Sequence, residues 1–234
     1  MTQPQDPIRQ KVKQLANQAI AQSNPSSWFE VLYAESKGDA NQVPWAKLTP
    51  HPYLQDWLKT HSPSNNQKSA LIIGCGLGDD AEAFAKQGFQ TTAFDISPTA
   101  VAWCQQRFPD STVTYTVADL LAIKSQWQHA FDLVFECRNI QALPLSIRST
   151  VIESVACFVA VGGTLLMITG FRETEAEPDG PPWYLSESEL NQIEKLGFIE
   201  VSRLFFGESN QQYLRIEYYR QKLSSIKLRN INET

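Results

Sequence analysis

The segment from Leu71 to Ser97, LIIGCGLGDDAEAFAKQGFQTTAFDIS, is the part of the sequence that most constrains the fold. An apolar run ends in three closely spaced glycines, a helix-like segment follows, and a second apolar run ends at Asp95. A strand, a glycine turn and a helix that leads to a second strand are typical of the first nucleotide-binding unit of an open α/β sheet. The segment therefore predicts a nucleotide-type ligand at the carboxyl ends of parallel strands.

From Ala70 onward, apolar runs alternate with helix-like segments. The runs are ALIIG, QTTAFD, TVTYTVA, FDLVFE and GTLLMITG, with helices expected over 80–87, 98–108 and 144–160. Such alternation predicts a parallel sheet covered by helices on both faces. A helix opened by the capping box Ser186–Glu189 precedes FIEVSRLFF and QQYLRIEYYR, whose short connection requires antiparallel pairing. We expect an α/β fold with a doubly wound, mainly parallel seven-stranded sheet and a C-terminal antiparallel strand in a hairpin.

The beginning of the chain has a different pattern. Asp6-Pro7 can open a helix with its apolar residues on one face, and an irregular, aromatic segment follows over 24–45. The polar stretch HSPSNNQKS reads as a linker. At 234 residues the chain suits one α/β domain with a decorating segment. We predict an N-terminal helix and aromatic cap over 1–67, the α/β domain over 68–222 and a polar tail over 223–234.

Composition excludes several classes of partner. The net charge of −5 disfavours a nucleic-acid partner, because phosphate binding needs a basic surface. The apolar runs are too short to span a membrane, and the polar start is unlike a signal peptide. The four cysteines and three histidines are scattered, which indicates reduced thiols and no metal site. We expect a cytoplasmic protein, a monomer or weak dimer, that binds no nucleic acid and no membrane.

The identity of the nucleotide depends on the glycines and the strand-end acids. Gly74, Gly76 and Gly78 give G-x-G-x-G, and Asp79 occupies the position of the third glycine of a dinucleotide fingerprint. Asp95 lies 21 positions after Gly74, close to the spacing of about 20 expected for an acid that accepts both ribose hydroxyls. A turn without any ligand, with strand-end acids acting as helix caps, is the structural alternative. An NAD(P)-dependent oxidoreductase is the functional alternative, and we interpret its Tyr-x-x-x-Lys pattern at Tyr33–Lys37 as coincidence because it precedes the first strand.

These segments together resemble the successive motifs of class I S-adenosylmethionine-dependent methyltransferases. The resemblance rests on LIIGCGLGDD, GFQTTAFDIS, VADLL, FDLVFE and VAVGGTLLMI. The leader, with WFEVLY, VPW and PHPYL, is similar to the entry segment of the thiopurine and halide/thiol methyltransferase-like group. That group also lacks the acid before the first glycine, where Ile73 stands here. The resemblance covers roughly residues 28–220 and implies a Rossmann-like methyltransferase fold.

The resemblance implies S-adenosylmethionine as cofactor and S-adenosylhomocysteine as its product. It implies that the backbone N–H groups of the glycine turn hold the carboxylate of the methionine portion. It implies that carboxylates at strand ends hold the ribose and the adenine, and that aromatic rings of the leader attract the sulfonium. The expected cofactor residues are Trp28, Trp45, Gly74, Cys75, Gly76, Gly78, Asp95 and Ile96 (ribose), Asp119 and Leu120 (adenine), and Glu136. The alternative for Trp28 and Trp45 is that they fix the leader to the core.

The acceptor should bind beyond the carboxyl ends of the first and fourth strands. Glu136 is our candidate for orienting the cofactor amino group or acting as a base, and capping the next helix is its alternative role. Arg138 and Asn139 depart from the halide/thiol pattern, and Arg138 suits an anionic acceptor, unless it is a solvated surface residue. Trp183 ends a long acidic, proline-rich loop typical of a lid.

We therefore expect an enzyme that transfers a methyl group in line to a small molecule, favouring a thiol or another soft nucleophile. No Ser–His–Asp or paired-carboxylate constellation stands out, which fits a reaction whose donor brings its own leaving group. A protein that binds the methyl donor without catalysis is the remaining alternative.

Overall fold

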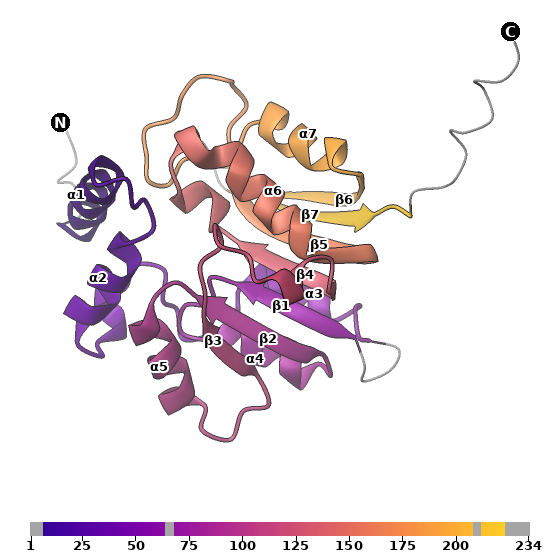
Figure 1. Ribbon diagram of the computed structural model, residues 1–234, viewed down its shortest axis with the longest axis horizontal. Helices are drawn as coiled ribbons and strands as arrows, with labels where there is room; N and C mark the ends of the chain where they lie inside the picture. Colours follow the sequence, from indigo (N-terminus) through magenta and orange to yellow (C-terminus); the bar gives the residue numbers. More distant parts are fainter. Residues whose placement is uncertain (1–6, 64–67, 208–211, 223–234) are drawn as a thin grey trace, which may run out of the picture.

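The computed structural model describes residues 7–63, 68–207 and 212–222, and the tail predicted over 223–234 lies outside them. Seven strands form one sheet in the order β3-β2-β1-β4-β5-β7-β6 (Figure 1). The strands are β1 (Ser69–Ile73), β2 (Gln90–Asp95), β3 (Thr114–Val117), β4 (Phe131–Cys137), β5 (Val159–Phe171), β6 (Phe198–Phe206) and β7 (Gln212–Arg220). The first five strands pair in parallel, and β7 pairs antiparallel with both β5 and β6. The prediction of a doubly wound, mainly parallel sheet with an antiparallel C-terminal hairpin is confirmed.

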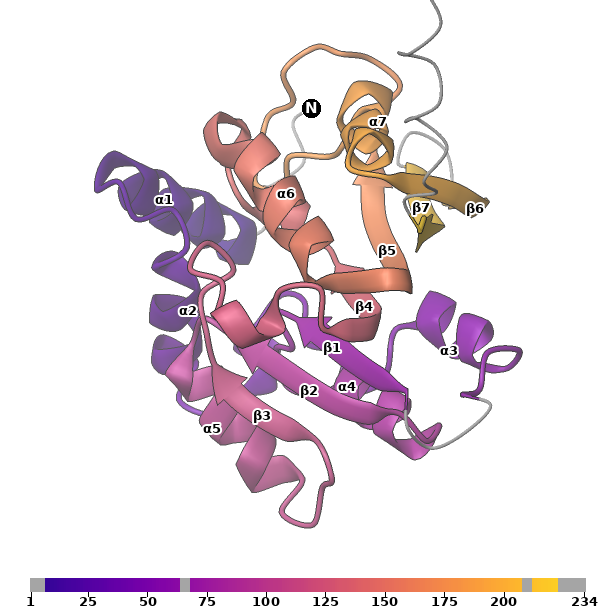
Figure 2. The same ribbon diagram turned by 45° about the vertical axis from the view of Figure 1, so that its right-hand side comes forward.

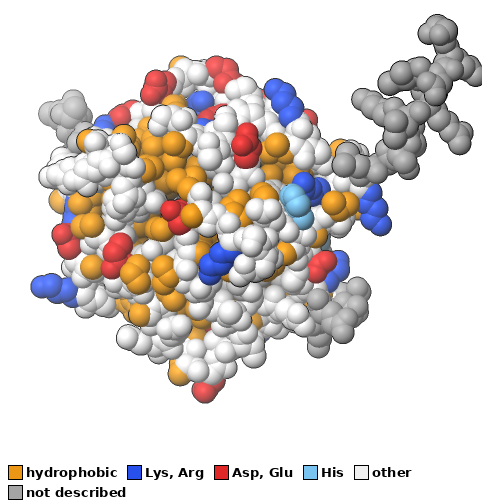
Figure 3. Space-filling model, viewed as in Figure 1, with side chains coloured by type: hydrophobic (Ala, Val, Ile, Leu, Met, Phe, Trp, Pro, Cys, Tyr) orange, Lys and Arg blue, Asp and Glu red, His pale blue; other side chains and the backbone are white. Residues whose placement is uncertain are grey.

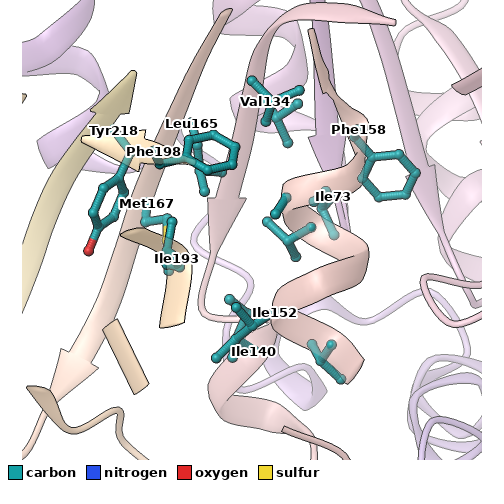
Figure 4. Packing of buried hydrophobic residues seen from close by; sticks show 14 of the residues in the cluster. Ile73, Val134, Ile140, Ile152, Phe158, Leu165, Met167, Ile193, Phe198 and Tyr218 are labelled. Atoms are coloured by element: carbon teal, nitrogen blue, oxygen red, sulfur yellow. The ribbon is translucent and has the colours of Figure 1, made fainter. Parts of the chain in front are cut away.

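Helices cover both faces of the sheet because both faces of its central strands are apolar. On one face, α6 (Arg148–Phe158) and α7 (Glu187–Lys195) pack on a core that includes Ile73, Val134 and Met167 (Figure 4). On the other face lie α3 (Pro52–Leu58), α4 (Asp79–Lys86) and α5 (Pro98–Arg107). Glu136 and Cys137 follow one another in β4, so their side chains point to opposite faces.

The leader is more helical than the sequence indicated. After α1 (Pro7–Ala21), the segment expected to be irregular forms α2 (Trp28–Ser36) and a short 3₁₀ turn, η1 (Ala40–Gln42). In both views α1 and α2 lie side by side at the edge of the molecule (Figures 1 and 2). Aromatic residues have modest helix propensity, and tertiary contacts overrode that preference here. The carboxylate of Glu30 anchors α2, because it accepts hydrogen bonds from the hydroxyls of Ser97 (2.5 Å) and Thr99 (2.6 Å).

The helix expected over 144–160 begins later and ends earlier. A 3₁₀ turn, η4 (Leu145–Ile147), precedes α6, and β5 begins at Val159 directly after the helix. The strand expected to begin at Gly163 begins at Val159 instead, so Gly162 and Gly163 both lie within it. A Cβ at Gly163 would lie 2.9 Å from the carbonyl oxygen of Ala160, so the glycine allows a close backbone approach at this irregular part of the strand.

Local capping signals were read correctly. The hydroxyl of Ser97 accepts the N–H of Ala100 at the start of α5, and the Ser186–Glu189 capping box opens α7. Two further 3₁₀ turns, η2 (Ser125–Trp127) and η3 (Ile140–Ala142), flank β4. Among the described helices, none combines the length and apolar character of a membrane span.

Candidate functional site

The glycine turn between β1 and α4 needs all three of its glycines. Gly74, Gly76 and Gly78 have φ angles of 56°, 55° and 92°, a region that side chains disfavour. Crowding adds a second requirement, since a Cβ at Gly78 would lie 2.7 Å from the Tyr115 hydroxyl. A Cβ at Gly74 would lie 1.8 Å from Oδ1 of Asn139. The turn is therefore packed from both sides and held in one shape.

Most of the N–H groups of this turn already have protein acceptors. The N–H of Cys75 donates to the carbonyl of Phe94 (2.9 Å), and that of Gly78 donates to the carbonyl of Cys75 (3.0 Å). The N–H of Gly76 donates to Oδ2 of Asp95 (3.0 Å). These three N–H groups hold the turn together, and the binding of the donor carboxylate by N–H groups of the turn stays a prediction. The Cys75 side chain is buried among the residues under α4, so it faces the core.

Asp95 lies at the end of β2, where the sequence placed the ribose contact. Its Oδ1 accepts the N–H of Ser97 (3.0 Å), and with the bonds from Gly76 and Ile96 the carboxylate still keeps a lone pair for a ligand. Burial raises the pKa of Asp95 to about 6, although the hydrogen bonds from Ser97 and Gly76 offset part of that effect. Ile96 beside it is half-buried. Asp95 is thus a preorganised acceptor tied to the glycine turn.

Asp119 lies beside Asp95, because the N–H of Ala118 donates to the carbonyl oxygen of Asp95 (3.1 Å). Its Oδ1 accepts the N–H of Leu121 (2.8 Å), which is the local turn role that was the structural alternative. Leu120 is buried in the core under α6. The two predicted strand-end acids are therefore brought together at one edge of the sheet.

Trp45 lies against the glycine turn, whereas Trp28 is a packing residue. A Cβ at Gly76 would lie 4.0 Å from the Trp45 ring, and 36% of Trp45 remains exposed. Its Nε1 donates to the hydroxyl of Tyr33 (2.7 Å), which fixes the ring. Trp28 is buried between α1 and Trp183, and its ring meets that of Trp45 edge to face at 5.8 Å. The Trp45 ring is thus partly exposed beside the turn, where an aromatic ring attracts a cation.

Glu136 is buried at the end of β4, paired in register with Ile73 of β1. Its Oε1 accepts the N–H groups of Asn139 (2.5 Å) and Ile140 (3.0 Å), which is the capping role. Its Oε2 is buried and has no hydrogen-bond partner among the described residues. Burial raises the pKa of Glu136 to about 7, against the effect of the two N–H bonds. The Asn139 side chain donates to the carbonyl of Ile73 (2.9 Å), the last residue of β1, so Asn139 stabilises the start of the glycine turn.

Arg138 has a left-handed backbone (φ 65°) and a half-buried side chain. Its guanidinium carbon lies 4.9 Å from the centre of the Tyr213 ring. Burial and then the charge of Arg138 lower the pKa of His51 to about 4, whereas burial raises the pKa of Asp80 to about 6 and Arg138 offsets part of that rise, which places both groups near it. Trp183, which with Asn139 was also predicted as a substrate residue, is buried against the leader, and its backbone N–H donates to the carbonyl of Gln141 (2.7 Å). Arg138 and Trp183 therefore lie in different surroundings.

The residues on the donor side fit a cationic nucleoside ligand. Two carboxylates, the buried unpartnered Oε2 of Glu136 and the exposed face of Trp45 converge on the edge formed by β1, β2 and β4. Carboxylates accept from ribose hydroxyls and from an amino group, and an aromatic face attracts a sulfonium. Within the part of the chain that the structure describes, no group of three His, Cys, Asp or Glu residues could hold a metal ion.

Sequence reasoning missed several residues around these groups. Tyr33 is buried against the glycine turn, where its hydroxyl orients Trp45, so its Tyr-x-x-x-Lys pattern has no oxidoreductase role. Around Arg138 lie His51, Asp80, Tyr184 and Tyr213, from four separate segments. The PHPYL motif was the one sequence signal that included His51. It did not predict which residues lie near His51 in the folded protein.

Comparison with known proteins agrees with this geometry. The family model for thiopurine S-methyltransferase (TPMT) matches residues 35–212. A probable thiol methyltransferase 2 of Arabidopsis thaliana is 26% identical over 196 residues, covering 82% of each chain. A thiopurine S-methyltransferase of Aliivibrio salmonicida is 22% identical over 197 residues, covering 78% of this chain and 90% of the relative. A solved S-adenosylmethionine-dependent methyltransferase of Mesorhizobium loti has the same fold, with a TM-score of 0.57 at 17% identity over 70% of this chain and 96% of its own.

Proposed function

The chain belongs to the thiopurine S-methyltransferase family, and from that premise we propose that its methyl acceptor is a small thiol or another soft nucleophile. The enzyme itself is an S-adenosylmethionine-dependent methyltransferase with a Rossmann-like fold. The curated relatives with similar length include thiol and thiopurine methyltransferases, which supports sulfur as the acceptor atom. Neither alternative, an NAD(P)-dependent oxidoreductase or a non-catalytic binding protein, receives support from these relatives.

One observation supports a small acceptor above all others. The leader and the closing loop, which we define as residues 172–186, meet above the carboxyl edge of the sheet. Trp28 of α2 and Trp183 of the closing loop share one buried cluster with Ala16 and Ala19 of α1. Lys13 of α1 also forms an ion pair with Asp179 of the closing loop (2.7 Å). A macromolecular acceptor needs an open groove, and these contacts cover part of the edge that would have to admit it.

The donor residues have distinct roles in this proposal. Asp95 would accept the ribose hydroxyls, and Asp119 with Leu120 would bound the adenine. Trp45 would face the sulfonium, and Oε2 of Glu136 would accept from the amino group of the methionine portion, so we assign Glu136 to positioning and not to proton abstraction. Gly74, Gly76 and Gly78 would let the methionine portion approach the backbone of the turn.

When bound, S-adenosylmethionine supplies a methyl group on a sulfonium sulfur, which keeps the bonding electron pair as the methyl leaves and so needs no acid. The protein's contribution is to orient the acceptor and exclude water, and such proximity is worth about 7–11 kcal/mol of the barrier. The closing loop and the leader are the segments that would exclude water. A thiol acceptor would lose its proton to solvent, and no dedicated base is required.

We also propose that residues 1–67 act as the cofactor cap of the catalytic domain over 68–222. We infer a cytoplasmic monomer or weak dimer that binds no nucleic acid. On the face seen in Figure 3, Lys and Arg side chains are dispersed and form no continuous basic stripe. The net charge of −5 supports the same inference.

A panel experiment tests the proposal. The enzyme would be incubated with donor carrying a labelled methyl group and with thiols, phenols, amines and carboxylic acids, with tRNA and a protein extract in parallel. We expect label in the thiols. Label in tRNA or protein, with none in the small molecules, would refute the proposal. A thermal-shift comparison should show stabilisation by S-adenosylhomocysteine and none by NAD.

A further inference from the structure

Arg138 differs from the other described arginines that are at least half-buried. Each of those has an ion pair or a hydrogen bond; they are Arg107, Arg148, Arg172, Arg203, Arg215 and Arg220. The guanidinium of Arg138 has neither with any described residue, and its Nε is fully buried without a partner. Its aromatic contact is with the ring of Tyr213.

An unpaired, partly buried guanidinium is costly, because the N–H of its Nε has lost water without gaining an acceptor. The planar guanidinium presents its donors in a fork that matches a carboxylate in bidentate geometry. The nearby acid does not supply that partner. Asp80 instead accepts the backbone N–H of His51 at its Oδ1 (2.6 Å) and forms no ion pair with Arg138. The buried Nε without a partner, on a guanidinium that forms no ion pair with a described residue, therefore indicates a ligand oxygen.

The surroundings of Arg138 are mainly aromatic, and the charged groups near them are Asp80 and, beside Tyr184, Arg9 of α1. We call His51, Tyr53, Tyr184, Phe206 and Tyr213 the aromatic wall. Tyr53 stacks on Phe206 at 3.6 Å, His51 lies 5.1 Å from Tyr53, and the hydroxyls of Tyr184 and Tyr213 meet at 3.0 Å. Burial, and then the charge of Arg138, lowers the pKa of His51 to about 4, so His51 is neutral at pH 7 and adds no second cation.

We propose that the methyl acceptor carries a carboxylate, which Arg138 binds through its guanidinium while the aromatic wall packs on the apolar part of the molecule. This inference deepens the proposed function and rests on it for the identity of the acceptor site. It assigns Arg138 a role in substrate specificity.

The methyl donor also has a carboxylate, in its methionine portion. The position of Arg138 decides whether it binds the carboxylate of the donor or that of the acceptor. The guanidinium lies over β7, on the side of β4 toward β5. Asp95, Asp119 and the Gly76 N–H lie on the opposite side of β4, toward β2 and β3. The acceptor is therefore the favoured source, and the donor's carboxylate becomes an outcome of the test.

The turnover test uses two thiols that differ only in charge, 3-mercaptopropionate and 3-mercaptopropionamide. Arg138→Gln should lower kcat/KM about 10- to 100-fold for the carboxylate and less than about threefold for the amide, as expected for loss of a charge-assisted pair. Arg138→Lys should recover part of the loss. Lys86→Gln is the matched control, because Lys86 is exposed at the far end of α4 and its removal changes the net charge equally. Equal losses for both thiols would overturn the proposal.

A binding test separates this proposal from the thiol assignment. Binding of 3-phenylpropionate and 3-phenylpropionamide to the S-adenosylhomocysteine complex would be titrated by ligand-observed NMR, since neither probe can be methylated on sulfur. Preference for the carboxylate that disappears in Arg138→Gln supports the site even if no thiol is a substrate. Absence of any preference in the wild-type protein refutes it. A more than tenfold weakening of S-adenosylhomocysteine in Arg138→Gln would also refute it, since it would assign Arg138 to the donor.

Discussion

The donor side and the acceptor side of this enzyme meet at β4 and are built in opposite ways. The donor side comes mainly from one stretch between Leu71 and Leu121, in which a glycine turn and two strand-end acids bond to one another. The acceptor side gathers His51, Asp80, Arg138, Tyr184 and Tyr213 from five segments. Its central cation has no hydrogen-bonding partner among the described residues.

This difference shows where each half obtains its stability. The donor turn satisfies its own N–H groups and its acids, so its shape does not depend on a ligand. The acceptor side leaves the Arg138 guanidinium unsatisfied, which makes that side depend on what binds there. We expect substitutions on the donor side to affect folding and donor affinity, and substitutions on the acceptor side to affect substrate choice.

The largest expected effect is on the donor turn. Gly78→Ala combines backbone strain at φ 92° with a Cβ only 2.7 Å from the Tyr115 hydroxyl. Gly197→Ala is a matched control, with the same φ of 92° and no atom within 4 Å of its Cβ. The control should lose about 1–2 kcal/mol of unfolding free energy from strain alone, and Gly78→Ala should lose about 1–3 kcal/mol more. Urea denaturation of both variants measures the difference, and equal losses would mean that the turn is not tightly packed.

The second effect concerns donor affinity. Asp95→Ala removes the acceptor for two backbone N–H groups and for the proposed ribose contact, so S-adenosylhomocysteine should bind about 2–4 kcal/mol more weakly. Asp119→Ala should cost less, because Asp119 bonds within its own turn and is not tied to the glycines. Calorimetry gives both values, with circular dichroism as the check on folding. Unchanged affinity in a folded Asp95→Ala protein would remove Asp95 from the site.

The same contrast explains how much the sequence could predict. The strands, the glycine turn and Asp95 were predictable because each depends on a local pattern of periodicity, φ requirement or spacing. The helix at Trp28–Ser36 was missed because contacts of Glu30 with Ser97 and Thr99, far along the chain, stabilise it. The environment of Arg138 was unpredictable for the same reason, since it exists only after β7 has paired with β5 and α3 has packed on the sheet. Trp28 belongs to a segment that resembles the family, and the resemblance implied a contact with the cofactor. In the structure Trp28 packs against α1.

A third effect, smaller than the first two at neutral pH, depends on Glu136. Its pKa is raised from 4.5 to about 7 in the folded protein, so unfolding releases a proton between these values. The stability contributed by the protonated carboxyl is present below pH 4.5 and is lost as pH rises through 7, up to about 3 kcal/mol in total. Glu136→Gln mimics the protonated form, so it should lose less stability than the wild type between pH 5 and pH 8. Urea titrations across this range test it, and parallel curves for the two proteins would contradict a raised pKa.

The smallest effect belongs to the contact that closes the acceptor side. Lys13 and Asp179 join α1 to the closing loop, but their side chains are 49% and 86% exposed. Such surface pairs contribute about 0.2–1 kcal/mol, because water screens them and two long side chains lose freedom. A double-mutant cycle of Lys13→Gln and Asp179→Asn should give a coupling energy within that range. It should equal that of Lys11 and Glu35, which join α1 to α2 and do not touch the loop. A coupling more than about 1 kcal/mol above this control would show that the ion pair holds the loop. Equal coupling energies for the two pairs would instead mean that the buried Trp28 and Trp183 rings hold the closing loop against the leader. In that case the loop should stay in place at high salt.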